Sequence, residues 1–225
     1  MDAGSTTTKA VLLDPETRAI VAAHYARTHD DPVAAVRECL MALIGQVGNR
    51  PVGLVSTTGS ARELIGAWLG TEQVYNEISA HAVGATHFAA DADTIFEIGG
   101  QDSKYIYLRN GVPIGYTMNN ACSAGTGSFF EESAQSDLGI HVSDIADIAL
   151  AALTPVKFKT TCAAFINSDI RIAQQQGQEH DNILAGLVYA IAENYLTKVK
   201  GQRPVGKKVL VQMVPARRVH WSLES

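Results

Sequence analysis

The sequence predicts an α/β protein laid out as two blocks with the same order of elements. Each block begins with a strand, a glycine-rich polar turn, a second strand, a turn and a third strand, and then becomes helical. The blocks agree in the order of their elements, with no close repeat of residue identity. Hydrophobic residues make up 46% of the 225 residues and aromatic residues only 7%. This composition supplies a core of small aliphatic side chains, as α/β domains have.

The first block, residues 1–90, is predicted to start with a hairpin. Strands are expected over 10–13 and 19–25, with a turn at Asp14-Pro15-Glu16-Thr17 between them. Apolar side chains then recur with a helical period over 31–48. The remaining elements expected in this block are a short buried strand over 52–56, a helix over 61–69 capped by Thr58-Gly59-Ser60, a brief strand at 74–75 and a helix over 78–89.

The second block, residues 91–225, is predicted to open with three strands and to continue as helices. Asn110-Gly111 separates the second and third strands and is a strong hairpin signal. The expected strands are 93–98, 104–109 and 112–118, and the expected helices are 126–138, 142–153, 163–176 and 181–200. A last strand is expected at 209–211, and whether it returns to the cleft of the first block is left open.

Charge and composition exclude several classes of protein. The formal net charge of −5 argues against a nucleic-acid binder, which would carry a basic face. No apolar run approaches the roughly 20 residues of a membrane span, and no signal peptide is expected from the residues that open the sequence. Three cysteines do not form a disulfide framework. A reducing, cytoplasmic compartment is therefore expected.

A first candidate phosphate-binding loop lies near the start of the chain, from Asp2 to Lys9. Glycine lets backbone approach a phosphate, and hydroxyl and amide groups donate to its oxygens. Asp2 is a candidate ligand for Mg²⁺, directly or through water. The loop does not match the Walker pattern, and taken alone it is equally well interpreted as a polar β-turn. The residues assigned to phosphate and magnesium are Asp2, Gly4, Ser5, Thr6, Thr7 and Lys9.

A second candidate loop follows an apolar strand in the same way, from Glu97 to Lys104. Gly99 and Gly100 would approach a phosphate, and Gln101 or Asp102 would orient an attacking water or reach the metal. Taken alone, this loop is also an ordinary hairpin turn. Two such hairpins, one in each block, can face each other and clamp the phosphates of a nucleotide.

Two cysteines, Cys122 and Cys162, lie in loops rich in small and polar residues. Each precedes a predicted helix, and a helix N-terminus lowers the pKa of a nearby thiol and stabilises its anion. Two thiolates are half of the four that an iron–sulfur cubane takes, so two chains would supply a complete set. The alternative for any single cysteine is a small buried hydrophobic residue. That interpretation is given to Cys39, on the predicted helix over 31–48.

Together these motifs resemble the activator proteins of 2-hydroxyacyl-CoA dehydratases and the related ATPase subunits of benzoyl-CoA reductases. The resemblance is carried by the two loops, by the segment around Cys122 and by residues 158–169, and it runs from Asp2 to about Gln212. It implies an actin-like, sugar-kinase-like (ribonuclease H-like) α/β fold with ATP and Mg²⁺ between two lobes.

The resemblance also implies a homodimer that holds one [4Fe-4S] cluster at its interface, with Cys122 and Cys162 of each chain as ligands. ATP binding and hydrolysis would change the angle between helices that end at the cluster. One low-potential electron would then pass to a 2-hydroxyacyl-CoA dehydratase or a related reductase. Reduced ferredoxin or flavodoxin would be the donor, and the protein would be sensitive to oxygen.

The ends of the chain depart from this family pattern. Met1 directly precedes Asp2, where the family has further residues of a first strand. The sequence Met213-Val214-Pro215 stands where the family has a Gly-Gly turn near the adenosine, and proline cannot reproduce that turn. A chain truncated or altered at both ends is therefore expected, with a changed adenosine site.

Two other functions remain open. A small-molecule kinase of the same fold, acting on a sugar or an acid, explains both phosphate loops but gives the loop cysteines no role. A truncated, non-hydrolysing module that still binds a cluster explains the cysteines and the altered end.

Overall fold

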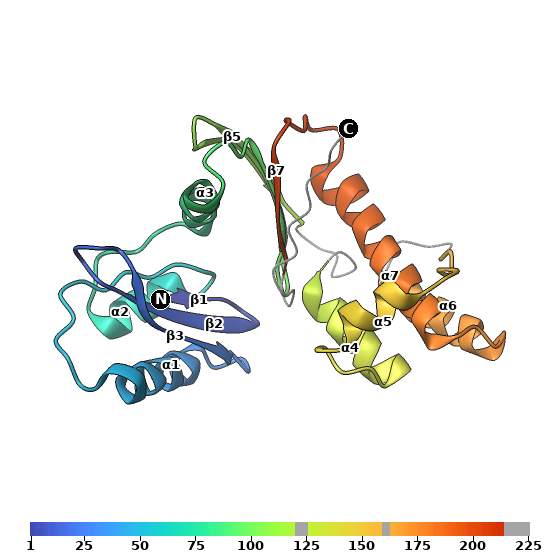
Figure 1. The fold of residues 1–225 in the computed structure, drawn as a ribbon, viewed down its shortest axis with the longest axis horizontal. Helices are drawn as coiled ribbons and strands as arrows, with labels where there is room; N and C mark the ends of the chain where they lie inside the picture. Colours follow the sequence, from blue (N-terminus) through green and yellow to red (C-terminus); the bar gives the residue numbers. More distant parts are fainter. Residues whose placement is uncertain (120–125, 159–162, 214–225) are drawn as a thin grey trace. The chain divides into compact units, whose positions relative to one another are not determined.

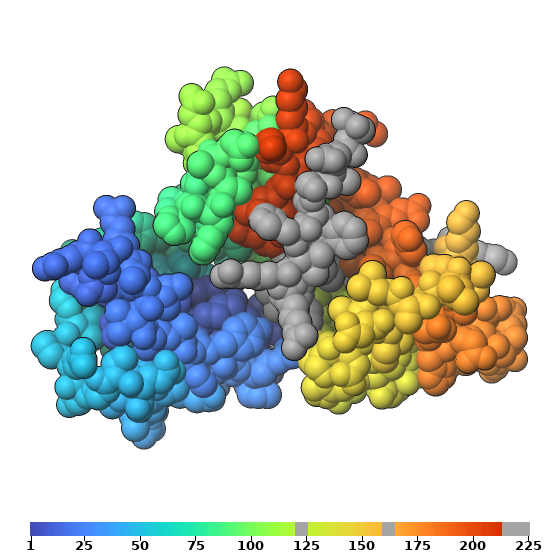
Figure 2. All heavy atoms as spheres, in the orientation of Figure 1, coloured from blue at the N-terminus to red at the C-terminus, as the bar shows by residue number. Residues whose placement is uncertain are grey.

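The computed structural model describes residues 1–119, 126–158 and 163–213; residues 120–125, 159–162 and 214–225 are drawn in grey (Figure 1; Figure 2). The chain forms two compact units, Met1–Gly84 and Ala85–Ser225. Each unit contains its own β-sheet. The two sheets carry the two predicted phosphate loops.

The first unit contains a three-stranded antiparallel sheet in the order β1-β2-β3. Its strands are β1 (Asp2–Ala3), β2 (Thr7–Leu13) and β3 (Ile20–Arg27). Helix α1 (Pro32–Val47) packs against one face of this sheet (Figure 1). Small side chains on the strands let the helix approach closely. The core between them contains Ala10, Ala22, Ala26, Cys39 and Leu43.

The start of α1 follows from local sequence. The Asp31 carboxylate accepts a hydrogen bond from the backbone N–H of Ala34 at 2.9 Å, as an N-cap does. Pro32 occupies the first turn, where its missing N–H is not needed. Val36, Cys39 and Leu43 follow at spacings of three and four residues and form the buried face. The helix predicted over 31–48 is confirmed.

Helix α2 (Arg62–Leu69) belongs to the first unit, and α3 (Glu77–Phe88) contains the boundary between the two units. Ile65 of α2 packs with Ala3 and Val36, which attaches α2 to β1 and α1. The N-cap of α2 is Ala61, and no side chain among the described residues caps it. The predicted cap at Thr58-Gly59-Ser60 is therefore wrong.

The short buried strand predicted over 52–56 is also wrong. Val52 is 54% exposed and Leu54 is 71% exposed, so the segment is not buried. Pro51 lacks an N–H and Gly53 has no side chain to pack, and both disfavour a strand. Bridge pairing begins only at Thr57, which bridges to Val74, and continues at Thr58.

The second unit contains a four-stranded sheet in the order β6-β5-β4-β7. Its strands are β4 (Thr94–Ile98), β5 (Ser103–Arg109), β6 (Val112–Met118) and β7 (Val209–Met213). Asn110 and Gly111 both have positive φ, 51° and 76°, which suits the tight hairpin turn that the sequence predicts. The last strand, β7, pairs in parallel with β4 and so belongs to this second sheet.

Helices α4 (Gly127–Leu138), α5 (Ile145–Ala151), α6 (Ala163–Gln175) and α7 (His180–Asn194) pack together in the second unit (Figure 1). Large side chains from all these helices form one core. Its largest members are Phe129, Phe130, Leu138, Ile145, Ile166, Ile170, Ile183, Leu184, Leu187 and Ile191. In the described parts of the chain, no helix combines the length and apolarity needed to cross a membrane.

The end of α7 continues as a π-helical turn, Tyr195–Lys200, in place of the regular helix predicted to residue 200. Tyr195 and Val199 pack against Ile98 and Tyr105 of the second sheet. The hydroxyl of Tyr195 donates to the backbone carbonyl of Lys104 at 2.7 Å. Burial of this phenol raises the pKa of Tyr195 far above its usual value, so it remains a donor. The helical layer is thus fixed to β5, directly after the second candidate loop.

Candidate phosphate-binding turns

The first candidate loop is a tight turn between β1 and β2. The backbone N–H of Gly4 donates to the carbonyl of Thr7 at 3.1 Å. A Cβ atom on Gly4 would lie 2.8 Å from that carbonyl oxygen, so the turn requires glycine. Thr28, which directly follows β3, also holds this turn. Its hydroxyl donates to the carbonyl of Gly4 at 2.8 Å and contacts the Thr8 hydroxyl at 3.1 Å.

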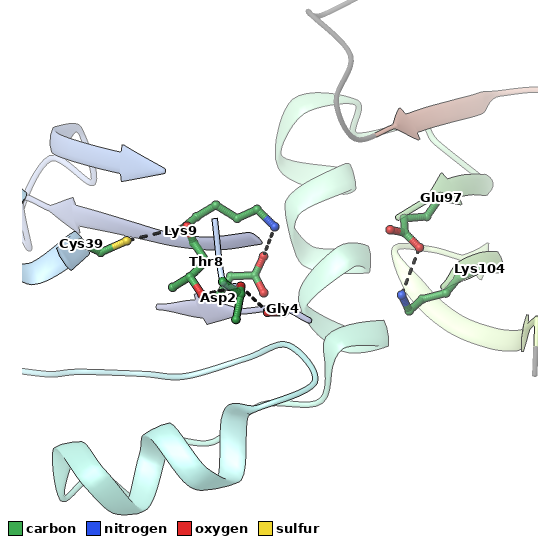
Figure 3. A network of polar contacts seen from close by, with 8 residues as sticks. Asp2, Gly4, Thr8, Lys9, Cys39, Glu97 and Lys104 are labelled. Carbon is green, nitrogen blue, oxygen red and sulfur yellow. Dashed lines mark hydrogen bonds and ion pairs between the residues drawn. The ribbon is translucent and has the colours of Figure 1, made fainter. Parts of the chain in front are cut away.

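Asp2 and Lys9 lie opposite each other across this turn and form an ion pair (Figure 3). Lys9 Nζ is 3.0 Å from Asp2 Oδ2, and it also lies 5.9 Å from the centre of the Tyr25 ring. The side chains of Asp2 and Lys9 are 39% and 31% exposed. Such a pair contributes at most about 1 kcal/mol to folding. Its carboxylate and ammonium groups remain accessible to a ligand.

The opposite face of the same strands is part of the core. Thr8 is fully buried there, and its carbonyl accepts a hydrogen bond from the thiol of Cys39 at 3.7 Å (Figure 3). Burial raises the pKa of the Cys39 thiol, which keeps it protonated and unreactive. The interpretation of Cys39 as a core residue is confirmed.

The second candidate loop is a turn of the same construction between β4 and β5. The N–H of Gly99 donates to the carbonyl of Asp102 at 2.8 Å. Across the strands, Lys104 Nζ lies 3.1 Å from Glu97 Oε2 (Figure 3). A Cβ atom on Gly99 would lie 2.6 Å from the Asp102 carbonyl oxygen and 2.7 Å from Glu97 Oε1. Glycine is therefore required here as well. Gln101 is exposed at the tip of this turn, and Asp102 is half-buried.

The two turns share a pattern of an acidic residue, a glycine and a lysine at the same spacing, which was not predicted. In each turn an acidic residue pairs with the lysine seven positions later. The glycine two positions after the acid donates to the carbonyl three positions further on. The equivalent residues are Asp2, Gly4, Thr7 and Lys9 in the first turn and Glu97, Gly99, Asp102 and Lys104 in the second. Aligning the two strand–turn–strand segments at their glycines would have revealed it.

The two ion pairs differ in burial. Glu97 and Lys104 are each only 7% exposed, so this second pair is part of the interior. Two buried charges are stable only as partners, because removing one leaves the other uncompensated. Glu97 and Lys104 were not predicted as site residues. The structure places them beneath the turn, whereas the other pair, Asp2 and Lys9, is accessible to solvent.

Cys122 and Cys162 lie outside the described residues. Within those residues, no group of three or more His, Cys, Asp or Glu side chains is placed to hold a metal ion. The residues that flank the segment around Cys122 are hydrogen-bonded to the second turn. Asn119 N–H donates to the carbonyl of Ser103 at 3.1 Å, and the Asn119 side-chain oxygen accepts from Ser103 N–H.

Helix α4, which follows that segment, also begins on the second turn. Its first N–H groups have no partners within the helix and need acceptors elsewhere. The N–H of Gly127 donates to the carbonyl of Gly99 at 2.8 Å, and the N–H of Ser128 donates to that of Gly100 at 2.9 Å. The second turn is therefore bonded to the chain on both sides of Cys122.

Comparison with known families identifies the chain. A family model described as the BadF/BadG/BcrA/BcrD ATPase family matches residues 1–213. The chain belongs to this ATPase family. The family resemblance drawn from the four sequence motifs is thereby confirmed.

Curated relatives agree with this family. The chain is 33% identical over 121 residues to the (R)-2-hydroxyglutaryl-CoA dehydratase activating ATPase of Acidaminococcus fermentans. This match covers 54% of this chain and 46% of that protein. It is 31% identical over 209 residues to the uncharacterised protein YjiL of Escherichia coli, covering 91% of this chain and 78% of that one. It spans 47% of the uncharacterised protein MJ0800 of Methanocaldococcus jannaschii. The chain thus spans about half the length of two of these relatives.

Solved structures show the same fold. The activator of 2-hydroxyisocaproyl-CoA dehydratase from Clostridium difficile, with bound ADPNP, matches with a TM-score of 0.84 and 27% identity, covering 93% of this chain and 77% of that one. Component A of the Acidaminococcus fermentans (R)-2-hydroxyglutaryl-CoA dehydratase matches with a TM-score of 0.82 and 26% identity, covering 95% and 81%. A putative 2-dehydro-3-deoxygalactonokinase shares the fold alone, at a TM-score of 0.51. The predicted actin-like, sugar-kinase-like α/β fold is confirmed.

Proposed function

We propose that this protein is an ATPase that activates a 2-hydroxyacyl-CoA dehydratase, or a related reductase, by passing it one low-potential electron. The observation that carries the proposal is the family match over residues 1–213, within which both phosphate turns lie. Relatives of this chain are named as dehydratase activators, and one similar structure contains a bound ATP analogue. The electron would come from reduced ferredoxin or flavodoxin and pass through a four-iron cluster.

The first turn fits the phosphates and Mg²⁺ of ATP by its chemistry. Lys9 supplies a cation, Ser5 and Thr6 supply hydroxyl groups, and Asp2 supplies the oxygen ligand that Mg²⁺ prefers. Thr7, also assigned to this site, is only 3% exposed. The accessible Asp2–Lys9 pair leaves these charges available. In the second turn, the residues assigned to the phosphate and to the attacking water are Gly99, Gly100, Gln101 and Asp102. Bound ATP would supply the free energy that drives the conformational change.

The hydrogen bonds around the second turn support coupling between nucleotide and cluster. The carbonyls of Gly99 and Gly100 hold the first N–H groups of α4, and Ser103 holds Asn119. A shift of this turn would therefore move both ends of the Cys122 segment. Coupling of this kind requires an element with two arrangements that both sites influence. We assign that role to the second turn together with α4.

Cys122 and Cys162 are the proposed cluster ligands. A four-iron cubane takes four thiolates, and each chain offers two loop cysteines beside its core cysteine, Cys39. A homodimer that shares one cluster satisfies this count. The cluster would supply a one-electron carrier whose potential depends on the hydrogen bonds and the solvent around it.

Iron analysis of anaerobically purified protein tests the proposal. The expected result is about two irons and two sulfides per chain, because two chains share one cubane. Cys122→Ala and Cys162→Ala should each lose the iron, whereas the matched control Cys39→Ala should retain it. Wild-type protein without iron would contradict the electron-transfer function.

A small-molecule kinase is the second candidate, favoured by the fold shared with a putative sugar-acid kinase and by the two phosphate turns. It requires no iron and should release ADP in air when given its acceptor substrate. Protein that contains the cluster but shows no ATP turnover would instead indicate a non-hydrolysing, cluster-binding module.

A further inference from the structure

The first sheet places one loop residue, Thr58, beside Asp2. Asp2 pairs with Lys9 on one side, and on its other side it forms an isolated parallel bridge with Thr58. Lys9 in turn pairs with Tyr25. Bridge partners on adjacent strands direct their side chains to the same face of a sheet. Thr58, Asp2, Lys9 and Tyr25 therefore form a row on the face opposite α1.

The hydroxyl of Thr58 is buried and lacks a hydrogen-bond partner among the described residues. The backbone of Thr58 is fixed: its N–H donates to the carbonyl of Met1 at 2.9 Å, and its carbonyl accepts from Ala3 at 2.8 Å. The neighbouring Thr57 hydroxyl, in contrast, donates to the carbonyl of Arg62 at 3.0 Å. Buried polar groups are nearly always paired, and an exception indicates a missing water, ion or ligand.

Gly59, the next residue, leaves space for the Asp2 carboxylate. Its φ is +92°, and a Cβ there would lie 2.6 Å from Asp2 Oδ1 and 2.6 Å from the carbonyl oxygen of Ala3. Asp2 Oδ2 is bonded to Lys9, so it is the other oxygen, Oδ1, that lies against this loop. The loop from Thr58 to Gly59 is thus shaped around the carboxylate assigned to Mg²⁺.

We propose that the Thr58 hydroxyl is a further binding group of the first phosphate turn, and that it holds a water molecule of the hydrated Mg²⁺ beside Asp2. This inference rests on the proposed function, in which this turn binds Mg·ATP. Mg²⁺ keeps several of its waters when proteins bind it, and those waters need acceptors. A hydroxyl accepts such a bond, whereas the ammonium of Lys9 offers donors alone.

This role predicts opposite effects on stability and on binding. Thr58→Val replaces the hydroxyl by a methyl group of the same shape. Removing an unpaired buried hydroxyl stabilises the ligand-free protein, and its melting temperature should rise by about 2–4 °C. Affinity for Mg·ATP should fall about tenfold, the loss expected for one hydrogen bond to a metal-bound water. A purely structural threonine would instead lower the melting temperature when replaced.

The experiment is isothermal titration calorimetry of the full chain with a non-hydrolysable ATP analogue, in Mg²⁺ and in EDTA. Thr58→Val should weaken binding in Mg²⁺ and leave binding in EDTA unchanged. Thr58→Ser, which keeps the hydroxyl, should bind like wild type, and so should the exposed neighbour variant Ser60→Ala. Thermal unfolding of each ligand-free variant supplies the second readout.

Several outcomes would overturn the inference. Wild-type affinity in Thr58→Val, an equal loss in Mg²⁺ and in EDTA, or a lower melting temperature would each do so. Failure of the proposed function has a different signature, because the wild-type chain itself would then bind no nucleotide under either condition.

Discussion

At the scale of single residues, each turn contains an ion pair between an acidic residue and a lysine, and the two pairs differ in burial. The Glu97–Lys104 pair is 7% exposed at each side chain, whereas Asp2 and Lys9 are 39% and 31% exposed. Lys104→Met should therefore lower the free energy of unfolding by about 3–5 kcal/mol, because it leaves a buried carboxylate unpaired. Lys9→Met, the matched variant, should lower it by at most about 1 kcal/mol. Urea denaturation followed by circular dichroism measures both.

The same two variants should show the reverse order in nucleotide affinity, with the larger loss in Lys9→Met. Lys9→Met removes an accessible cation from the first turn, whereas the folded fraction of Lys104→Met keeps the first turn and its cation. Equal losses of stability in the two variants would contradict the distinction between a supporting pair and a binding pair.

The role of a residue could be predicted where the sequence immediately around it determines that role. Cys39 was assigned to the core because it lies on the apolar face of a periodic helix, and the structure buries it. Thr58 was assigned to a helix cap because Thr-Gly-Ser is a common start signal. Its pairing with Asp2 is a contact between residues 56 positions apart, and no local pattern reports such a contact.

At the scale of elements, glycine fixes the second turn. A Cβ on Gly99 would meet the carbonyl of Asp102 at 2.6 Å, a backbone atom that cannot move without opening the turn. Gly99→Ala should therefore destabilise the protein by about 1–3 kcal/mol, as overpacking does. Gly115, in β6 of the same sheet, is the matched control, because a Cβ there would meet no atom of the described residues within 4 Å.

The Gly99→Ala variant should also affect α4, whose N–H groups are bonded to the carbonyls of Gly99 and Gly100. Hydrogen exchange at Gly127 and Ser128 should accelerate in Gly99→Ala and remain at the wild-type rate in Gly115→Ala. Unchanged exchange in both variants would show that α4 does not depend on the second turn.

Most elements could be predicted because their signals are local. The helical period of the apolar residues over 31–48 predicted α1, and Asn110-Gly111 predicted the hairpin of β5 and β6. The strand expected over 52–56 failed because its apolar residues, Val52 and Leu54, resemble a buried strand whether or not a partner strand is present. The π-helical turn at Tyr195–Lys200 was missed because its residues continue a helical pattern.

At the scale of the whole molecule, the sequence predicted the two turns, but their common pattern was not recognised. The pattern consists of an acid, a glycine and a lysine separated by unrelated residues, so it emerges from the sequence when the two segments are aligned at their glycines. The register of the strands makes it visible, because each acid lies directly opposite its lysine. Two copies of one strand–turn–strand construction, one in each unit, agree with the actin-like fold that the solved activator structures share.

Assembly supplies a test of the proposed cluster that does not depend on activity. In this proposal each chain of 24.0 kDa would offer two cysteine ligands, and two chains together, about 48 kDa, would complete a four-iron cubane. Metal binding is then coupled to association, because the ligand set exists only in the dimer. Anaerobic size-exclusion chromatography with light scattering should give the dimer mass, and removal of iron by a chelator should give the monomer mass. Cys122→Ala should be monomeric throughout, and Cys39→Ala should follow wild type. A dimer that survives complete loss of iron would show that protein contacts, and not shared thiolates, join the chains.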